Sequence, residues 1–234
     1  MKIFTTIISH HANNRIESLL KSWILDIRKP HEYLIVGDRK LKEKIKNNCI
    51  FFTECEPESY QKLYLKTYKT IEYLLNNCDF DFWHKCDDDV CVSYNRLVQF
   101  LSNFNSSQHL YIGCRTHSPK FNHYAAGFNY IISKSLLEKV FTIFTDRMKN
   151  DNEIFNYEDK AIGDMAQALN VDLIENKNFI CPFSHLDPVT QFKNISGLCL
   201  KNKNIIAATI HKQSEKYIPE IYKKMVGFKC IYLA

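Results

Sequence analysis

Strand-like and helix-like segments alternate along almost the whole chain, and this alternation restricts the folds that the sequence can adopt. The expected strands are residues 3–9, 32–37, 49–53, 80–86, 110–114, 130–132, 171–174 and 205–210, and the expected helices are residues 15–27, 41–47, 59–76, 95–101, 135–144, 157–169 and 217–226. Short apolar runs separated by amphipathic helices are typical of an α/β sheet with helices on its faces. We therefore predict the α/β class, with a loop-rich region between the last two strands.

The chain is long enough for one well-buried domain at 234 residues. Hydrophobic residues make up 45% of it and charged residues 24%, a composition that excludes a disordered chain. Repeats, low-complexity tracts and linkers are absent from the sequence. We therefore predict a single domain over residues 1–234.

Three consecutive carboxylates, Asp87, Asp88 and Asp89, follow the aromatic strand and precede the apolar residues 90–92. Like charges at the end of a buried strand are costly unless a cation neutralises them. A solvated acidic loop is the alternative, but such a loop is rarely framed by apolar residues on both sides. The framing favours a site for a hard cation with oxygen ligands, of the kind that holds a diphosphate.

Other polar motifs lie at the ends of expected strands and helices, and each has two interpretations. Gly127 makes a turn before a strand or faces a substrate. Glu158 and Asp159 cap a helix or take part in catalysis. His211 is a surface or core histidine at a strand end, or a ligand. A P-loop, a G-x-G-x-x-G fingerprint and a G-x-S-x-G elbow are absent from the sequence.

Charge and cysteine usage exclude several classes of protein. The net charge of +5 is mild and its lysines are dispersed, so we expect no nucleic-acid partner. The nine cysteines contain no C-x-x-C pair, which argues against a zinc site or a disulfide framework and favours small buried thiols. The apolar N-terminal run is too short for a signal peptide and no segment is long enough to span a membrane, so a cytoplasmic protein is expected.

Residues 85–90, Lys-Cys-Asp-Asp-Asp-Val, resemble the lysine-x-DDDV stretch of the β-1,3-galactosyltransferase and fringe glycosyltransferases (family 31), which have the GT-A fold. Further motifs of this family occur in the same order over about residues 3–226, so the match is far more specific than the triplet alone. They are Arg15 and Trp23, Leu65-Lys66-Thr67, Tyr111-Ile112-Gly113, the segment from Tyr124 through Gly127 to Ser133, Glu158-Asp159 with Gly163, and His211-Lys212.

This resemblance implies a GT-A-type domain with a mixed, mostly parallel sheet. Its Rossmann-like nucleotide-sugar-binding half would be residues 1–92, and its acceptor-binding and catalytic half residues 93–234. The implied reaction is an inverting transfer of a hexose or N-acetylhexosamine from a UDP-sugar to a hydroxyl of a glycan or glycoconjugate acceptor, forming a β-1,3 linkage. The implied cofactor is Mn²⁺ or Mg²⁺.

The resemblance also assigns roles to individual residues. Asp89 and His211 would hold the metal ion, and Asp159 would be the general base, with Glu158 as the rival base. The residues expected to contact the donor are Asp87, Asp88, Arg15, Lys85, Gly127 and Glu158.

The sequence departs from the family pattern at three positions and in one larger feature. Lys160 replaces a valine, Ala126 a cysteine and Asn129 a second glycine. The membrane anchor of eukaryotic members is not found, which favours a bacterial or viral origin. Two alternatives stay open: a non-catalytic module that binds a nucleotide-sugar or glycan, which Lys160 favours, and a metal-dependent nucleotidyltransferase, which the missing phosphate-binding glycine loop disfavours.

Overall fold

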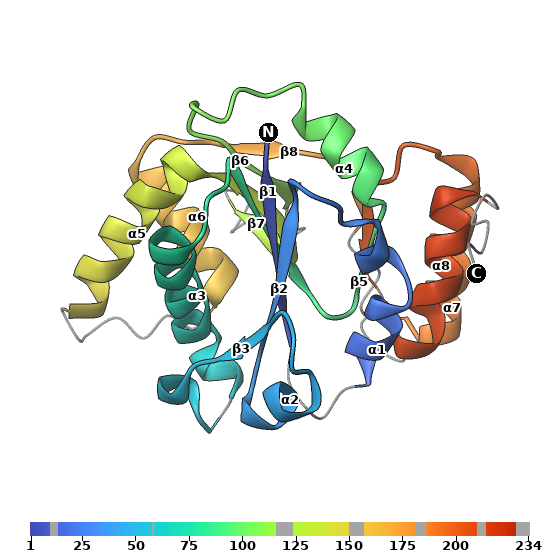
Figure 1. The fold of residues 1–234 in the computed structure, drawn as a ribbon. Helices are drawn as coiled ribbons and strands as arrows, with labels where there is room; N and C mark the ends of the chain where they lie inside the picture. Colours follow the sequence, from blue (N-terminus) through green and yellow to red (C-terminus); the bar gives the residue numbers. More distant parts are fainter. Residues whose placement is uncertain are drawn as a thin grey trace.

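A seven-stranded sheet runs through the middle of the protein (Figure 1). The structure is a computed structural model that describes residues 1–9, 14–57, 59–115, 124–149, 157–180, 186–209 and 214–227. The strand order is β3-β2-β1-β4-β7-β6-β8, and a small second sheet has the order β5-β10-β9. The strands are β1 (Ile3–Ile8), β2 (Glu32–Gly37), β3 (Cys49–Phe51), β4 (Phe82–Asp87), β5 (Val90–Val92), β6 (Tyr111–Arg115), β7 (Ala125–Ser133), β8 (Leu173–Glu175), β9 (Phe179–Ile180) and β10 (Ala207–Thr209).

The main sheet is mixed and mostly parallel. Strands β3, β2, β1 and β4 run parallel to one another, β7 is antiparallel to both β4 and β6, and β8 is parallel to β6. In β1, Ile8 pairs with Val36 on one side and with Asp87 on the other, so three strands end at the same level. The predicted α/β class with a mixed, mostly parallel sheet is therefore confirmed.

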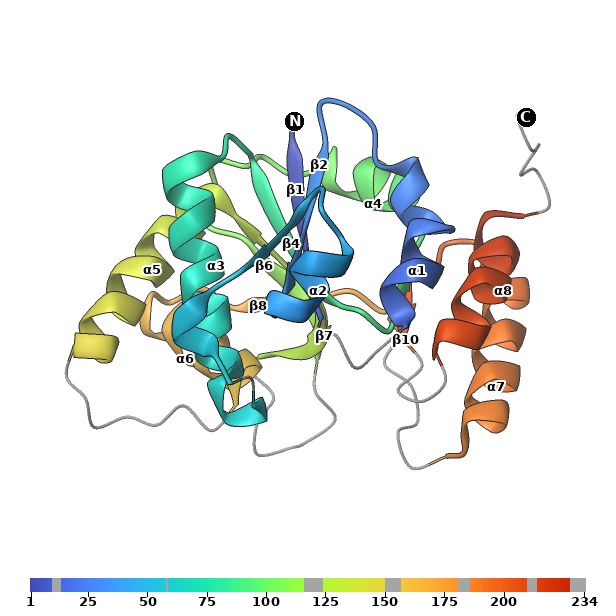
Figure 2. The ribbon, with the colours of Figure 1, turned by 60° about the horizontal axis from the view of Figure 1, so that its bottom comes forward.

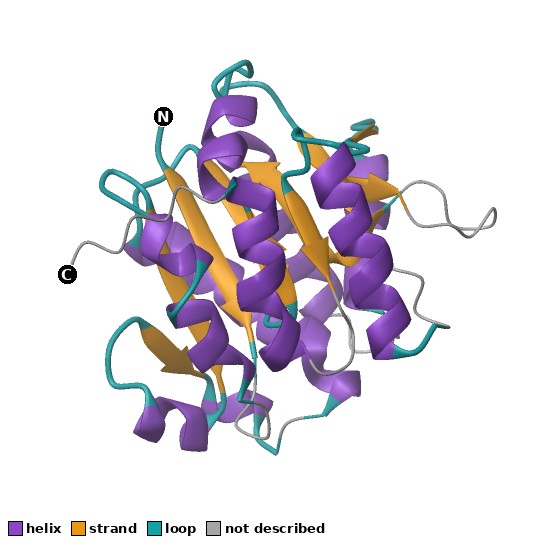
Figure 3. Ribbon diagram, turned by 90° about the vertical axis from the view of Figure 1, so that its right-hand side faces the viewer, coloured by secondary structure: helices purple, strands orange, loops and turns teal. Residues whose placement is uncertain are grey.

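Helices cover both faces of this sheet. Helices α3, α5 and α6 lie on one face, and α1, α4, α7 and α8 lie on the other side together with the small sheet (Figure 1). Figure 3, turned by 90°, shows helices lying across the strands. The helices are α1 (Arg15–Leu20), α2 (Arg39–Lys44), α3 (Leu63–Asn77), α4 (Tyr94–Leu101), α5 (Lys134–Lys149), α6 (Glu158–Ala168), α7 (Pro188–Lys201) and α8 (Ser214–Val226).

The alternation of side chains along each strand divides the core into two halves. Ile3 and Ile7 of β1 join the core under α1, α4 and α8, whereas Phe4 joins the core under α3, α5 and α6. In β4 the neighbours Phe82 and Trp83 separate in the same way. Successive side chains of a strand point to opposite faces, so both faces can be apolar when helices cover both.

Two predictions about secondary structure are wrong. The helix expected over residues 15–27 ends at Leu20 and continues as a 3₁₀ helix over Trp23–Asp26, where the indole of Trp23 donates to the carbonyl of Val90 over 2.9 Å. The region expected to be loop-rich contains α7. Asp187 caps this helix by accepting from two backbone amides and is followed by Pro188 in the first turn, a strong helix-start signal.

The described helices and cysteines can be compared with the predictions about membrane spans and thiols. None of the helices in the described ranges combines the length and apolarity that a bilayer-spanning segment requires. The cysteines at positions 49, 55, 78, 86, 91, 114 and 199 are free thiols, and all but the partly exposed Cys78 are buried. These thiols therefore act as small apolar side chains in the core.

Candidate functional site

The parallel strands of the main sheet all end at one edge, which Figure 2 turns toward the viewer. A cavity of about 730 Å³ lies at this edge. Its lining includes Ser9 after β1, Asp38 to Lys40 after β2, Cys55 and Glu56 beyond β3, and Asp87 to Asp89 at the end of β4. Ligands of open α/β sheets bind outside the carboxyl ends of the strands, so this cavity is the candidate site.

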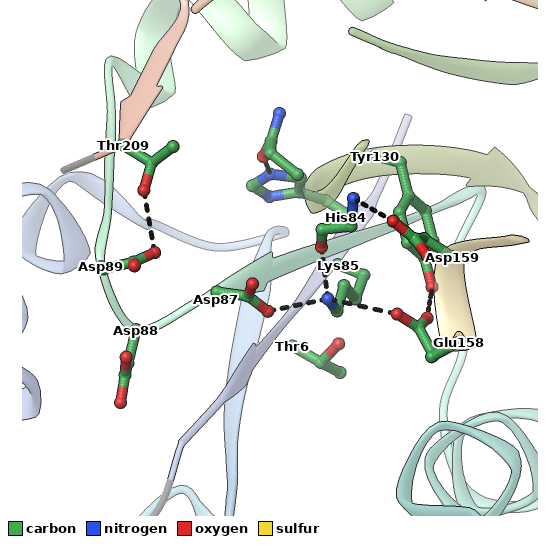
Figure 4. Close-up of polar contacts among 12 residues, drawn as sticks. Thr6, His84, Lys85, Asp87, Asp88, Asp89, Tyr130, Glu158, Asp159 and Thr209 are labelled. Atoms are coloured by element: carbon green, nitrogen blue, oxygen red, sulfur yellow. Dashed lines mark hydrogen bonds and ion pairs between the residues drawn. The ribbon is translucent and has the colours of Figure 1, made fainter. Parts of the chain in front are cut away.

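Two carboxylates of the acidic triplet have different partners, and Figure 4 shows the contact of Asp89 with Thr209. Asp88 accepts hydrogen bonds from the Ser9 hydroxyl at 2.6 Å and from the Arg15 guanidinium at 2.8 Å. Asp89 accepts a hydrogen bond from the Thr209 hydroxyl at 2.9 Å, and its other oxygen lies 3.9 Å from Arg15. Asp88 is therefore tied to the first strand and helix, and Asp89 to the small sheet.

Asp87 is bound to the buried Lys85. The two residues are two apart on β4 and share a face, and the Lys85 Nζ lies 2.7 Å from Asp87 Oδ1. Burial opposes the charge of Lys85, but Asp87 and Glu158 raise its pKa above the ordinary value. Burial raises the pKa of Asp87, Lys85 opposes that rise and Asp89 adds to it. Lys85 and Arg15 therefore offset only part of the triplet's charge, because two cations face three carboxylates and Lys85 is shared with Glu158.

Asp159 lies at the start of α6 and against β7. Its Oδ2 accepts from the amide of Gly127 at 3.0 Å, and its Oδ1 accepts from the amide of Lys160 at 2.9 Å. Gly127 belongs to β7 rather than to a turn, and a Cβ there would lie 3.1 Å from Asp159 Oδ2. The glycine therefore allows the close approach of the carboxylate.

Glu158 has a different environment from its neighbour Asp159. It is 5% exposed, it accepts a hydrogen bond from the Tyr130 hydroxyl, and its other oxygen lies 3.6 Å from the Lys85 Nζ. Burial raises the pKa of Glu158, while Lys85 opposes that rise. Its carboxylate is thus enclosed by protein groups, whereas Asp159 is only partly buried.

A chain of contacts joins the triplet to Asp159. Lys85 binds Asp87 on one side and donates to the carbonyl of Gly127 on the other, and the amide of Gly127 binds Asp159. The Lys160 ammonium pairs with Asp164 over 2.5 Å, one turn further along α6. Residues far apart in the sequence therefore meet at one place. His211, the other predicted metal ligand, lies outside the described residues.

Two residues that contact the acidic triplet, Ser9 and Thr209, were not predicted from the sequence. Both are hydroxyl residues at the ends of predicted apolar strands, and each donates to a carboxylate of the triplet. Like the triplet, they lie at the ends of predicted strands, and this position in the sequence could have identified them as candidate site residues. Lys66 of the Leu-Lys-Thr motif is also buried here and donates to the carbonyl of Ser9 over 3.0 Å.

Some side chains that line the cavity could bind a divalent metal ion. No group of three or more His, Cys, Asp or Glu side chains within the described ranges is arranged to hold a metal. Asp89 nevertheless lines the cavity and offers hard oxygen ligands, as Mn²⁺ and Mg²⁺ prefer. The residues therefore fit an ion that would take oxygen ligands from Asp89 and from a bound diphosphate.

The sequence pattern of the family described as Fringe-like matches residues 2–198. The chain belongs to the Fringe-like family. This family assignment agrees with the resemblance carried by the acidic triplet and the motifs around it.

Two curated relatives from Arabidopsis thaliana have names that state an activity. "Probable beta-1,3-galactosyltransferase 5" is 27% identical over 155 residues, which cover 56% of this chain and 37% of that protein. "Probable beta-1,3-galactosyltransferase 1" is 26% identical over 171 residues, which cover 63% of this chain and 43% of that protein. The Fringe-like chain thus spans well under half the length of these two relatives.

A solved structure shows the same fold. The apo-form glycosyltransferase GlyE from Streptococcus pneumoniae superposes with a TM-score of 0.53 at 12% identity, over 91% of this chain and 55% of that chain. The likeness is one of fold alone at this identity. It confirms the glycosyltransferase-type α/β architecture that the sequence predicts.

Proposed function

We propose that this Fringe-like chain is an inverting glycosyltransferase that moves a hexose or N-acetylhexosamine from a UDP-sugar to an acceptor hydroxyl, forming a β-1,3 linkage. One observation carries the proposal: the acidic triplet at the cavity and Asp159 on α6 are joined by the contacts of Lys85 and Gly127. Membership of the family and the names of its relatives support the same class of reaction.

The cavity suits a nucleotide diphosphate donor. Its volume of about 730 Å³ lies within the range of small-molecule sites. Arg39, Lys40 and Lys62 line it beside the acidic triplet, and their positive charge favours an anionic ligand. Asp87 and Asp88 also line it, which supports the proposal that they accept hydrogen bonds from the sugar and ribose hydroxyls.

A divalent ion, Mn²⁺ or Mg²⁺, would be held by Asp89, with His211 as a second ligand. Thr209, two residues before His211, binds Asp89 directly, which supports this pairing. When bound, such an ion stabilises the negative charge that develops on a diphosphate leaving group. Arg15, which lies 2.8 Å from Asp88 and 3.9 Å from Asp89, offsets part of the negative charge of these carboxylates.

Asp159 is the general base of the proposed reaction. The two backbone amides that bind its carboxylate hold its orientation, while each oxygen has a further lone pair. The acceptor hydroxyl transfers its proton to Asp159 as its oxygen attacks the anomeric carbon, and the bond from that carbon to the diphosphate breaks on the opposite face. The enclosed Glu158 lacks this access.

Two exposed tyrosines suit the acceptor side of the site. Tyr60 lines the cavity and is 67% exposed, and Tyr157, which precedes α6, is 55% exposed. Burial raises the pKa of Tyr60, and the charges of Asp159 and Asp87 add to that rise. Exposed aromatic rings at a site offer apolar faces for a sugar.

The test is release of UDP from a panel of UDP-sugars in the presence of Mn²⁺. Asp159→Asn is expected to lower turnover by about 10²–10⁴-fold while leaving UDP binding unchanged, because only the proton acceptor is lost. Asp89→Ala is expected to abolish metal-dependent UDP binding as well. Asp164→Asn, on the same helix, is the matched control and should retain activity.

The outcomes also separate the alternatives. Binding of a UDP-sugar without release of UDP would indicate a non-catalytic module, and formation of UMP or pyrophosphate would indicate a nucleotidyltransferase. Wild-type turnover in both Asp159→Asn and Asp89→Ala would refute the proposal.

A further inference from the structure

We infer that Lys85 is a positioning residue that holds Asp159 in place from inside the protein rather than a residue that binds the donor. The inference rests on the proposed role of Asp159 as general base. Lys85 is 1% exposed, and its ammonium lies between β4, β7 and α6 (Figure 4). A side chain in that place can act on the reaction only through its neighbours.

Protein groups surround the ammonium of Lys85. It donates hydrogen bonds to Asp87 Oδ1 at 2.7 Å and to the carbonyl oxygen of Gly127. Glu158 Oε2 forms an ion pair with it at 3.6 Å, and the centroid of the Tyr130 ring lies 5.5 Å away. With 1% of Lys85 exposed, these groups separate its ammonium from the space in which a donor would bind.

The contacts of Lys85 reach Asp159 by two routes. The first runs through Gly127, whose carbonyl binds Lys85 and whose amide binds Asp159 over 3.0 Å. The second runs through Glu158, which lies next to Asp159 in the first turn of α6 and is held by Lys85 and by the Tyr130 hydroxyl. Loss of Lys85 would therefore loosen both Gly127 and Glu158, the two neighbours through which it holds Asp159.

A purely electrostatic role is the competing explanation. In that case Lys85 only balances the charges of Asp87 and Glu158, and any neutral arrangement would serve as well. Lys85→Met alone cannot separate the two explanations, because it leaves two carboxylates without their cation and is strongly destabilising. The double variant Lys85→Met/Glu158→Gln removes one positive and one negative charge together, and Glu158→Gln alone is its matched control.

Thermal unfolding, UDP binding with Mn²⁺, kcat and donor KM are compared among the wild-type protein, which has the same net charge as the double variant, the double variant and Glu158→Gln. Amide hydrogen exchange over residues 124–133 is measured in the same three proteins. If Lys85 positions Asp159, kcat of the double variant falls at least about 10-fold below that of the other two proteins, and by more than donor KM rises, because displacement of a reacting group by about 1 Å costs up to about 10² in rate. Exchange at Gly127 becomes faster, while exchange in β6 does not change.

A second variant, Lys85→Arg, tests the same inference if the double variant fails to fold. Lys85→Arg keeps the positive charge but changes the direction of the N–H donors. The electrostatic explanation predicts wild-type kcat for Lys85→Arg, and the positioning explanation predicts a lower kcat with donor KM little changed.

The inference is overturned if Gly127 exchanges equally fast in the double variant and in Glu158→Gln, or if both have the same kcat. Failure of the proposed function looks different. In that case the wild-type protein releases no UDP from any donor, and the amide exchange comparison still decides whether Lys85 holds Gly127.

Discussion

His84 makes the stability of this protein depend on pH in a way that can be measured without a substrate. Its ring is fully buried on β4, with Nε2 at 2.5 Å from Asn129 Oδ1 and Nδ1 at 3.2 Å from the Thr5 hydroxyl. Burial lowers the pKa of His84 from 6.5 to about 4, and the hydrogen bond with Asn129 opposes this only in part. A neutral ring that donates from Nε2 and accepts at Nδ1 satisfies both neighbours.

The sign and the size of the effect follow from linkage. Between pH 6.5 and about 4 the unfolded chain binds a proton at His84 that the folded protein does not bind, so the free energy of unfolding falls as the pH is lowered through this window. The loss attributable to His84 is about 2 kcal/mol at pH 5 and about 3 kcal/mol at pH 4. Above pH 7 the histidine contributes no slope, because both states are neutral.

The assay is urea unfolding of the wild-type protein and of His84→Gln at pH 7.5, 6.5, 5.5 and 5. Whatever the substitution costs at pH 7.5, the wild-type protein is expected to lose about 2 kcal/mol more than the variant between pH 7.5 and 5. His109→Gln, at an exposed histidine, serves as the matched control and should follow the wild-type protein. Parallel pH curves for the wild-type protein and His84→Gln would refute the reasoning.

Two further substitutions test the geometry around the proposed base. Gly127→Ala places a Cβ 3.1 Å from Asp159 Oδ2, so the carboxylate must shift by a few tenths of an ångström. We expect kcat to fall about 10-fold, with a melting temperature close to that of the wild-type protein. An unchanged kcat would contradict a role for this close contact in catalysis. Lys160→Val restores the residue that is usual in the family. Because the Lys160 ammonium pairs with Asp164, we expect kcat within about 3-fold of the wild-type value. A large change in kcat would show that the charge of Lys160 acts on Asp159.

The fold was largely predictable because its signals are local. The short apolar and aromatic runs near residues 3–9, 32–37 and 80–86 predict strands that are buried on both faces of a sheet, and β1, β2 and β4 appear there. Helix α7 lies in the region predicted to be loop-rich, although Asp187 and Pro188 form a helix-start signal in the sequence. The break after Leu20 follows from the tertiary hydrogen bond of Trp23 to Val90, which no local pattern contains.

The site was predictable in its location but not in its internal contacts. Asp87 and Asp159 can be found from strand-end and helix-start patterns, yet the residue that connects them, Gly127, lies in neither element. Its two hydrogen bonds depend on the antiparallel pairing of β7 with β4, in which Lys85 lies opposite Tyr130. Such pairing is non-local, so a motif alone could suggest that these residues act together but not how.

The acidic triplet illustrates why adjacent identical residues need not be equivalent. Asp87, the last residue of β4, shares a face with Lys85 and therefore belongs to the half of the core that holds α6. Asp88 lies beyond the strand and is held by Ser9 and Arg15, so its carboxylate serves first to join the ends of β1 and β4. Asp89 is the member attached to β10, the strand that leads toward His211. Substituting the three in turn should therefore produce three different phenotypes: weaker anchoring of Lys85, lower stability, and loss of metal-dependent UDP binding. A uniform loss of binding with unchanged stability across all three would show that they act as one cluster instead.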